Sequence, residues 1–245
     1  MADFINTIDV LGDDAVMDGI ISRTITEFKD DKIAKIGPGA FAGCKSLASV
    51  DLPNATTTEG LIFTDCTALA TVNLPSLTKI GEQAFRGCKA LKTISLPALT
   101  VTTGYLGFEG CSALESVIFP VEEEVGIYSF QGCSSLKIID LPALSKIKTG
   151  GLQCQNLIAL LLRKNSVCTL ENTNAFQGAI VNGTGYIYVP SALIDSYKAA
   201  ANWSNFADQF RSLEEWTVDG TVTGELSDRI YSVCGDFLCG EAVCG

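Results

Sequence analysis

The residues of this chain with the most chemical potential are its ten cysteines, and the chain contains no histidine. Cys88 lies close to Arg86, Lys89 and Lys92. Neighbouring positive charge lowers a thiol pKa and so favours the nucleophilic thiolate. Without histidine, however, the chain lacks the imidazole that pairs with a cysteine or serine nucleophile and that binds zinc. The role of Cys88 therefore depends on where the fold places it.

A second group of cysteines lies near the C-terminus. Cys234, Cys239 and Cys244 follow one another at a spacing of five, each with glycine after it. Zinc sites use four ligands, usually in Cys-x2–4-Cys pairs, and Cys168 would join these three only if the fold happened to bring it there. We interpret the segment as a tail or a short pentapeptide-like repeat, with an interchain disulfide or a metal site as alternatives. No cofactor or metal is predicted.

Five of the other cysteines belong to a repeated unit of 22 or 23 residues, at Cys44, Cys66, Cys88, Cys111 and Cys133. A phenylalanine lies three residues before each one, namely Phe41, Phe63, Phe85, Phe108 and Phe130. Each cysteine is followed by leucine three positions later and then by aliphatic-x-apolar-Pro. A sixth copy lacks one residue, and a seventh keeps only its phenylalanine and closing strand. A unit of 20–29 residues with leucine at these positions is typical of a leucine-rich solenoid.

Each part of the unit has a structural interpretation. Leu-x-x-Val-x-Leu is a short strand with alternate residues inward, and proline ends it because proline has no N–H for the next hydrogen bond. Gly-x-x-Ala-Phe-x-Gly-Cys is a turn with a short helical piece. One unit cannot bury its apolar face alone, whereas stacked units share a core. We therefore predict an α/β leucine-rich repeat solenoid, with a short parallel β-sheet on one face and turns and short helical pieces on the other.

The repeated cysteines and phenylalanines are predicted to form an inward-facing core ladder. Buried cysteine packs as a small hydrophobic group. Adjacent coils are close enough for disulfides, but parallel stacked side chains rarely offer the required torsion. We expect free buried thiols, with disulfides, catalysis and metal binding as the other options. No basic cluster like that of Cys88 surrounds Cys66, Cys111 or Cys133, so a structural role is expected for Cys88 as well.

The ends of the chain depart from the repeat. Residues 1–32 are predicted to form an N-terminal cap, and residues 33–190 a solenoid of about seven coils. Residues 191–211 are predicted to form a capping helix with Ser191 as its N-cap. Its apolar face would contain Leu193, Ile194, Tyr197, Ala200 and Ala201. Residues 212–245 are predicted to be a linker or short hairpin followed by the cysteine-bearing tail.

Composition argues against several classes of partner. The chain has 17 basic and 28 acidic residues and a net charge of −11, so neither nucleic acid nor an anionic membrane is an expected partner. No apolar run approaches the roughly 20 residues of a membrane span. Residues 1–21 contain five aspartates and no basic residue, unlike a secretory signal. We expect the chain to stay inside its cell, to leave by a route without a cleaved signal, or to have been trimmed.

The unit at 80–97, IGEQAFRGCKALKTISLP, resembles the leucine-rich repeat of BspA-like bacterial surface proteins. The resemblance is close over residues 33–163 and extends to about residue 210. It implies a non-catalytic recognition protein that is surface-exposed or faces a host. Similar repeat proteins occur in prophage and phage tail regions of gut bacteria, and the SRTITEF stretch at 22–28 resembles their opening. A cell-surface, extracellular or virion-associated location is therefore expected by resemblance.

An enzymatic function is not predicted, although solenoids do include glycosidases and polysaccharide lyases. Asp51 and Asp140 occupy equivalent outward strand positions four coils apart, which is roughly 19 Å at ~4.8 Å per coil. Paired glycosidase carboxylates lie about 5–9.5 Å apart. The acidic run of residues 122–124 is predicted to be a solvated loop after Pro120.

The outward strand residues are the predicted binding site. Most are small and polar, namely Ser49, Asp51, Thr71, Asn73, Thr93, Ser95, Ser116 and Asp140. The other end of this face turns apolar at Ile118, Ile138, Ala159 and Leu161. We predict non-catalytic recognition or adhesion, with a protein or glycan partner, at a bacterial surface or in a phage tail. The alternatives are a merely solvated β-surface and a structural spacer that holds other modules apart.

Overall fold

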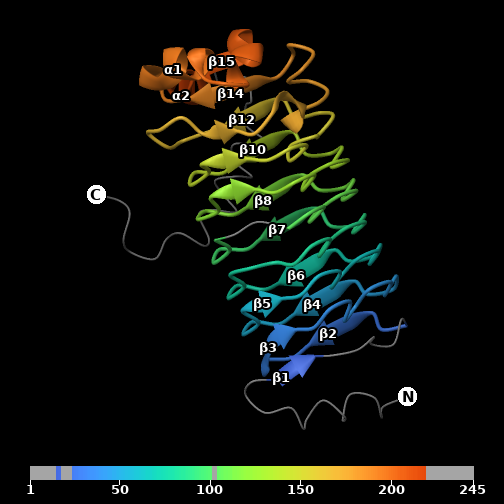
Figure 1. Cartoon of the computed structure of the whole chain (residues 1–245). Coiled ribbons are helices and arrows are strands. Elements are labelled where there is room, and N and C mark those ends of the chain that lie inside the picture. Colours follow the sequence, from blue (N-terminus) through green and yellow to red (C-terminus); the bar gives the residue numbers. More distant parts are fainter. Residues whose placement is uncertain (1–14, 18–23, 101–103, 219–245) are drawn as a thin grey trace.

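A computed structural model of the chain describes residues 15–17, 24–100 and 104–218. Successive coils stack along one axis and form a solenoid (Figure 1). β1 (Ala15–Met17) and β2 (Glu27–Lys29) lie at one end, and β15 (Phe210–Ser212) and α2 (Leu213–Val218) lie at the other. The predicted fold class, a leucine-rich repeat solenoid, is confirmed.

One face of the solenoid has a short strand in every coil. These strands are β2, β4 (Ser49–Asp51), β6 (Thr71–Asn73), β7 (Thr93–Ser95), β8 (Ser116–Ile118), β10 (Ile138–Asp140), β12 (Ala159–Leu161), β14 (Tyr186–Val189) and β15. They pair in parallel in three groups, β2-β4-β6, β7-β8 and β10-β12-β14-β15. The outward side of this column is called the strand face below. Because β2 and β15 take part in it, the stack extends beyond residues 33–190 at both ends.

A second column of strands lies on another side of the coils (Figure 1). β1, β3 (Ile33–Ile36) and β5 (Thr57–Thr58) form one parallel sheet. β9 (Glu124–Val125), β11 (Lys146–Ile147) and β13 (Thr169–Leu170) form another. The sequence analysis predicted strands on one face only. Four of these six strands, β5, β9, β11 and β13, have only two residues, which is too short to produce a recognisable alternation of inward and outward residues.

The Phe-Cys segment of each coil is a series of turns, and the predicted short helical pieces are not there. Gly39 and Gly43 in this segment have φ values of 63° and 71°, and the equivalent residues of the next four coils are also left-handed. A right-handed helix does not accommodate such residues. In the part of the chain that the structure describes, the first helical element after these coils is η2 (Thr173–Ala175).

The turns are hydrogen-bonded from coil to coil. In one pair of coils, the N–H groups of Leu61, Phe63 and Asp65 donate to carbonyl oxygens of the following coil at 2.7, 2.8 and 2.8 Å. The same three bonds recur along the stack, for example from Phe85 to Gly107 at 2.8 Å. The coils are therefore joined through their turns as well as through their strands.

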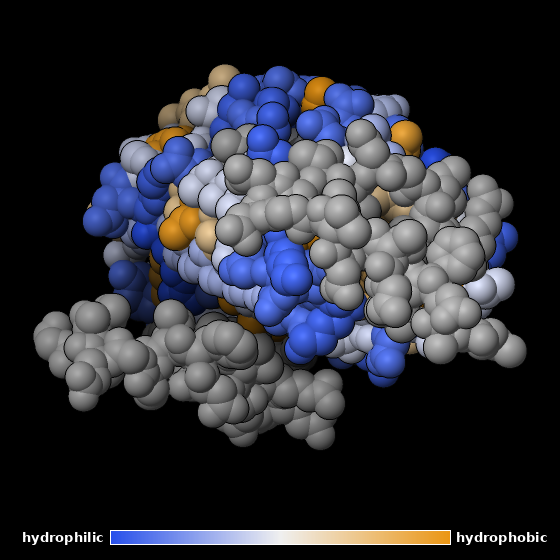
Figure 2. All heavy atoms as spheres, turned by 90° about the horizontal axis from the view of Figure 1, so that it is seen from below, coloured by the Kyte–Doolittle hydropathy of each residue, from blue (hydrophilic) through white to orange (hydrophobic). Residues whose placement is uncertain are grey.

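The interior contains the predicted ladder of phenylalanines and cysteines. The ring centroids of Phe41 and Phe63 are 5.1 Å apart, and those of Phe85 and Phe108 are also 5.1 Å apart, with a 5° angle between the planes. All five repeat cysteines are free thiols with 0% exposure. Seen from the end near β1, the coloured surface is mainly hydrophilic, with scattered hydrophobic residues (Figure 2). The hydrophobic side chains of the repeat thus face the interior.

The cysteines also act as hydrogen-bond donors. The Cys66 thiol donates to the carbonyl of Phe41 in the preceding coil at 3.0 Å, and Cys88 donates to Phe63 at 3.2 Å. The bond recurs for Cys111, Cys133 and Cys154. The Phe41 carbonyl already accepts the N–H of Cys44, so the thiol satisfies its second lone pair. This contact explains why cysteine occupies the position instead of another small hydrophobic residue.

Burial keeps these thiols protonated. It raises the pKa of Cys66, Cys111 and Cys168 to about 12 and raises the pKa of Cys88 and Cys133 well above the ordinary value. Arg86 lies near Cys88 in sequence, but its guanidinium forms an ion pair with Glu109 at 2.7 Å. The environment of Cys88 is therefore the opposite of the one that activates a nucleophile.

The C-terminal cap consists of several short elements. η3 (Ser191–Leu193) and α1 (Ile194–Ala199) are followed by η4 (Trp203–Gln209) and then by β15 and α2. The helix predicted over residues 191–211 is interrupted at Asn202, which has a φ of 64°. Pro190, and not Ser191, precedes the first helical residue, and no side chain caps that end. Residues 212–218 form the end of β15 and all of α2, where a linker was predicted.

Aromatic side chains of the cap close the last coil. Tyr197, Trp203, Phe206 and Phe210 are at most 5% exposed. The Tyr197 hydroxyl accepts the N–H of Cys168 at 2.8 Å, and the Trp203 indole donates to the Cys168 carbonyl at 2.6 Å. Cys168 is thus a buried part of the cap contact. The tail cysteines Cys234, Cys239 and Cys244 and most of the predicted N-terminal cap lie outside the described residues. None of the described helices is long and apolar enough to span a membrane.

We expect the free energy of unfolding to fall as the pH rises above about 9. A thiol whose pKa is higher in the folded state than in the unfolded state makes its full contribution to stability while the pH is below the unfolded pKa. This contribution is lost as the pH rises from the unfolded pKa toward the folded pKa. Between these two pKa values, each such thiol should lower the free energy of unfolding by about 1.4 kcal/mol per pH unit. Urea denaturation between pH 7 and pH 11 measures the slope.

Alkylation with iodoacetamide at pH 8 provides an independent check of thiol burial. Cys44, Cys66, Cys88, Cys111, Cys133, Cys154 and Cys168 should react only after denaturation, as mapped by mass spectrometry of tryptic peptides. Rapid labelling of any of them in the native protein would contradict the buried ladder.

The left-handed turn residues give a second prediction. Leu61 has a φ of 67° and is 43% exposed, so its side chain contributes little burial. Leu61→Gly should be more stable than Leu61→Ala by about 1 kcal/mol, because only glycine adopts this conformation without steric cost. Thermal denaturation of both variants tests this. Ala70→Gly, at an exposed residue with ordinary backbone, is the control and should destabilise. Equal stability of the two Leu61 variants would contradict the assignment.

Candidate interaction surface on the strand face

The predicted binding residues form two columns on the strand face. Ser49 pairs with Thr71, and Thr93 pairs with Ser116, which places four hydroxyls in one column. Asp51 pairs with Asn73 in the other column, and Ser95 lies beside Ile118. Thr71, Asn73 and Thr93 are exposed, while the other predicted residues are partly buried. The fold therefore brings the sequence-predicted set onto one surface.

A charged network occupies the N-terminal end of this face. The Lys29 ammonium lies 2.6 Å from the Asp51 carboxylate, and the Asn73 side-chain amide donates to Asp51 at 2.7 Å. The pKa of Asp51 is lowered mainly by the hydrogen bond from Lys29 and next by the hydrogen bond from Asn73. The contact between Lys29 and Asp51 in turn raises the pKa of Lys29. Lys29 was missed in the sequence, although Thr26-Glu27-Phe28-Lys29 aligns with the strand of the next coil. The Lys29 side chain is 76% exposed, so the network orients groups at the surface and contributes little stability.

The middle of the face carries hydroxyls that are available to a partner. Within the described residues, the side chains of Thr71, Thr93, Ser95 and Ser116 form no hydrogen bond with another group. Elsewhere, threonine hydroxyls are used inside the stack, as when Thr78 donates to the Thr56 carbonyl at 3.1 Å. The strand face thus presents hydroxyls without such hydrogen bonds, aligned on neighbouring strands.

The apolar end of the face is covered by the chain itself. Ile138, Ala159 and Leu161 are 6%, 1% and 1% exposed, and they pack with Tyr188, Leu213 and Trp216. The rings of Tyr188 and Trp216 are 4.8 Å apart and meet edge to face. Leu213 and Trp216 belong to α2, so the helix that follows β15 folds back over the strand face. Three of the four apolar residues predicted on this face, Ile138, Ala159 and Leu161, are therefore not available to a partner, whereas Ile118 in β8 stays partly exposed.

Asp140, the last residue of the predicted set, is engaged within the chain. The guanidinium of Arg163 contacts its carboxylate at two points, Nε to Oδ1 at 2.8 Å and Nη2 to Oδ2 at 2.7 Å. In such a bidentate pair, both carboxylate oxygens accept a charge-assisted hydrogen bond from the guanidinium. We therefore place the candidate surface on β2 to β8 and leave Asp140 outside it.

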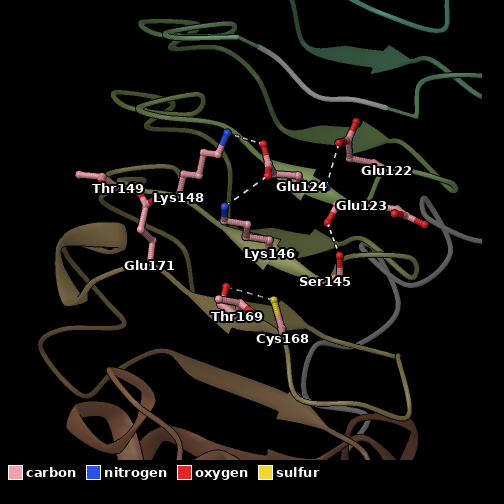
Figure 3. Close-up of polar contacts among 10 residues, drawn as sticks. All are labelled: Glu122, Glu123, Glu124, Ser145, Lys146, Lys148, Thr149, Cys168, Thr169 and Glu171. Atoms are coloured by element: carbon pink, nitrogen blue, oxygen red, sulfur yellow. Dashed lines mark hydrogen bonds and ion pairs between the residues drawn. The ribbon is translucent and has the colours of Figure 1, made fainter.

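The acidic run at 122–124 is not the solvated loop that was predicted (Figure 3). Glu122 is fully buried, and its carboxylate accepts the N–H of Glu124 at 3.1 Å. Glu124 lies in β9 and forms ion pairs with Lys148 at 2.5 Å and Lys146 at 3.7 Å. Only Glu123 has an exposed side chain. The lysines that pair with Glu124 come from the next coil, so the local sequence gave no sign of them.

The described residues contain no group of three or more His, Cys, Asp or Glu side chains arranged to hold a metal ion. The geometry of the strand face supports contact with a partner surface.

Comparison with known proteins identifies the class. The BspA type leucine-rich repeat region matches residues 21–122 and 61–182, in six copies. The chain belongs to this family of bacterial leucine-rich repeat proteins. The family consists of repeat proteins that are generally not enzymes, and its known members include cell-surface proteins.

Solved structures resemble the chain in fold. A leucine-rich cell surface protein of Faecalibacterium prausnitzii A2-165 is 25% identical, with a TM-score of 0.59, and the match covers 73% of this chain and 50% of that protein. The chain thus spans half the length of that relative. A leucine-rich repeat protein of T. pallidum is 23% identical with a TM-score of 0.49, over 71% of this chain and 82% of that one. No curated protein sequence matches the chain.

The cover formed by α2 can be tested by removing its aromatic anchor. Trp216→Ala should lower the free energy of unfolding by about 1–2 kcal/mol, because it exposes the apolar end of the strand face and removes an aromatic pair. It should also increase binding of the hydrophobic dye ANS to the folded protein. Glu215→Ala changes an exposed residue of the same helix and is the control. If the two variants behave alike, α2 does not cover this surface.

Proposed function

We propose that this chain is a non-catalytic recognition module that binds a protein partner through the strand face of β2 to β8. The observation that carries the proposal is the alignment of exposed hydroxyls on Thr71 and Thr93, with Ser95 and Ser116 beside them, which form no hydrogen bond with another group in the described part of the chain. Solenoids bind through extended surfaces of this kind. Many weak hydrogen bonds across a rigid row of strands favour a broad and shallow contact.

The two ends of this surface support the same function. At one end, Lys29 and Asp51 present a pair of charges, with Asn73 hydrogen-bonded to Asp51, and such charges select partners by electrostatic complementarity. At the other end, α2 removes the apolar residues from solvent, which limits non-specific adhesion. The remaining surface is polar, and specificity depends on geometry more than on hydrophobic contact.

Adhesion at a bacterial surface is the setting that we favour. The F. prausnitzii relative is a leucine-rich cell surface protein, and the family is one of bacterial surface repeats. A phage tail is a second setting in which the same module would recognise a bacterial or host surface. A glycan partner and a purely structural spacer are alternatives, and the experiment below separates them from a protein partner.

The test is binding of the purified chain to cultured epithelial cells and to gut bacteria, measured by flow cytometry. Changing Thr71, Asn73, Thr93 and Ser95 together to glutamate should weaken binding at least tenfold, because the new carboxylates repel the partner and block the hydroxyl column. The control carries glutamate at Ser112, Thr169, Ser196 and Ser204, which are exposed and lie off the strand face. Both variants add four negative charges, so a general charge effect would weaken them equally.

Each outcome has one meaning. Loss only in the strand-face variant supports the assignment, and equal binding of both variants contradicts it. Protease treatment of the cells should abolish binding to a protein partner, whereas loss on glycosidase treatment alone would indicate a glycan. Failure of the unmodified chain to bind any of these surfaces would favour the structural spacer.

A further inference from the structure

A second exposed surface lies where the Phe-Cys turns of four successive coils begin. We call this the coil corner and define it as residues 59–61, 81–83, 104–106 and 126–128. These segments lie side by side on four successive coils, since the N–H of Leu61 donates to Glu82, that of Gln83 to Tyr105 and that of Leu106 to Ile127, at 2.7, 2.9 and 3.0 Å. The coil corner is separate in sequence from the strand face, which consists of later residues in each coil.

The coil corner exposes apolar and aromatic side chains. Leu61 and Tyr105 are 43% and 44% exposed, and they are two of the five large hydrophobic residues that are exposed in the described part of the chain. The Tyr105 and Tyr128 rings meet edge to face with centroids 6.2 Å apart. Tyr128 lies against Gly150, where a Cβ atom would approach the ring to 2.1 Å. Tyr128 is therefore held by packing and supports Tyr105 at the surface.

Carboxylates lie next to these side chains. Glu59 and Glu82 are exposed, and neither forms an ion pair with another described residue, including the exposed Lys79. The Glu82 side chain lies against Gly104, where a Cβ atom would meet its Cγ at 2.8 Å, so it is adjacent to Tyr105. This arrangement differs from Glu109 and Glu124, which are paired with basic residues of neighbouring coils.

At four positions of the coil corner, a residue with a side chain has the left-handed backbone conformation that glycine adopts with the least strain. Leu61, Gln83, Leu106 and Tyr128 have φ values of 67°, 55°, 62° and 54°. The equivalent positions at the two ends of the row are Gly39 and Gly150. Strained non-glycine residues in a surface row suggest a function for their side chains. For Leu61, which is largely exposed, the function is not packing within the chain.

We propose that the coil corner is a second binding surface, which takes an arginine- or lysine-bearing segment of a partner protein. An aromatic face attracts a cation, and an adjacent unpaired carboxylate binds the same group by a charge-assisted hydrogen bond. The aliphatic stem of the partner side chain packs on Leu61 and Tyr105. The net charge of −11 attracts a cationic segment from solution. This surface is independent of the strand face and adds a second contact point to the recognition module.

The experiment uses a blocked peptide of alternating arginine and leucine, together with the same peptide carrying glutamate for arginine. Binding is measured by calorimetry at 150 mM salt, and two-dimensional NMR follows the ring signals of Tyr105 and Tyr128. The arginine peptide should bind and shift both signals, and the glutamate peptide should not bind. Glu82→Gln and Tyr105→Ala should each weaken binding at least fivefold, while Tyr105→Phe should keep it within twofold.

Two further variants control for charge and stability. Glu123→Gln removes one exposed carboxylate, as Glu82→Gln does, but lies outside the coil corner, so it should leave binding within twofold. Leu61→Gly should weaken binding although it relieves the strained backbone, which separates loss of contact from loss of folding. Equal loss in Glu82→Gln and Glu123→Gln, unshifted tyrosine signals or no binding of the arginine peptide would overturn the proposal. None of these variants changes the strand face, so its assignment is tested separately.

Discussion

The structure depends on the stacking of one coil on the next. Five successive coils each have a phenylalanine and a cysteine that are buried because the neighbouring coils cover them, and the phenylalanine rings of adjacent coils are 5.1–5.4 Å apart. Hydrogen bonds run in both directions along the stack. Turn N–H groups donate to the following coil, and cysteine thiols donate to the preceding one. A coil in isolation would lose both the burial and the partners of these groups, so stability is shared between neighbours.

This constraint determines what is available for function. Inward residues are committed to the stack, and many outward polar residues donate a hydrogen bond to the preceding coil, as Thr78 and Ser145 do. A stack also needs closed ends, and here the C-terminal cap does more than cover the last coil. Its final helix, α2, turns back over the strand face and covers Ile138, Ala159 and Leu161. In the described part of the chain, the strand face of β2 to β8 and the coil corner carry polar or aromatic groups at the surface.

The environment of a residue is predictable from the sequence where that environment repeats with the period of the sequence. The strand positions and the inward orientation of Phe85 and Cys88 follow from that period, because the same position is buried in successive coils. The environment is not predictable in this way where contacts join positions of different phase or different sequence context. Glu122 was expected in solvent and is buried, and the shorter strands such as β9 were not foreseen. The cover over the apolar end of the strand face was missed because it comes from residues about 50–80 positions further along the chain.

The sequence by itself determined the repeat, the solenoid class and the set of outward strand residues, since period and alternation of side chains follow from the geometry of a strand and a stack. Only the tertiary structure decided which of those outward residues are free. The carboxylate of Asp140 pairs with Arg163, and that of Asp51 is bound to Lys29 and Asn73. The hydroxyls of Thr93 and Ser116 form no hydrogen bond with another group in the described part of the chain. It also decided that the basic residues near Cys88 do not activate it. Arg86 is paired with Glu109 of the next coil, and burial holds the thiol in its protonated form. The reason is physical, because both outcomes depend on contacts between coils, and residues 22 or 23 positions apart in the chain meet only when the coils are stacked.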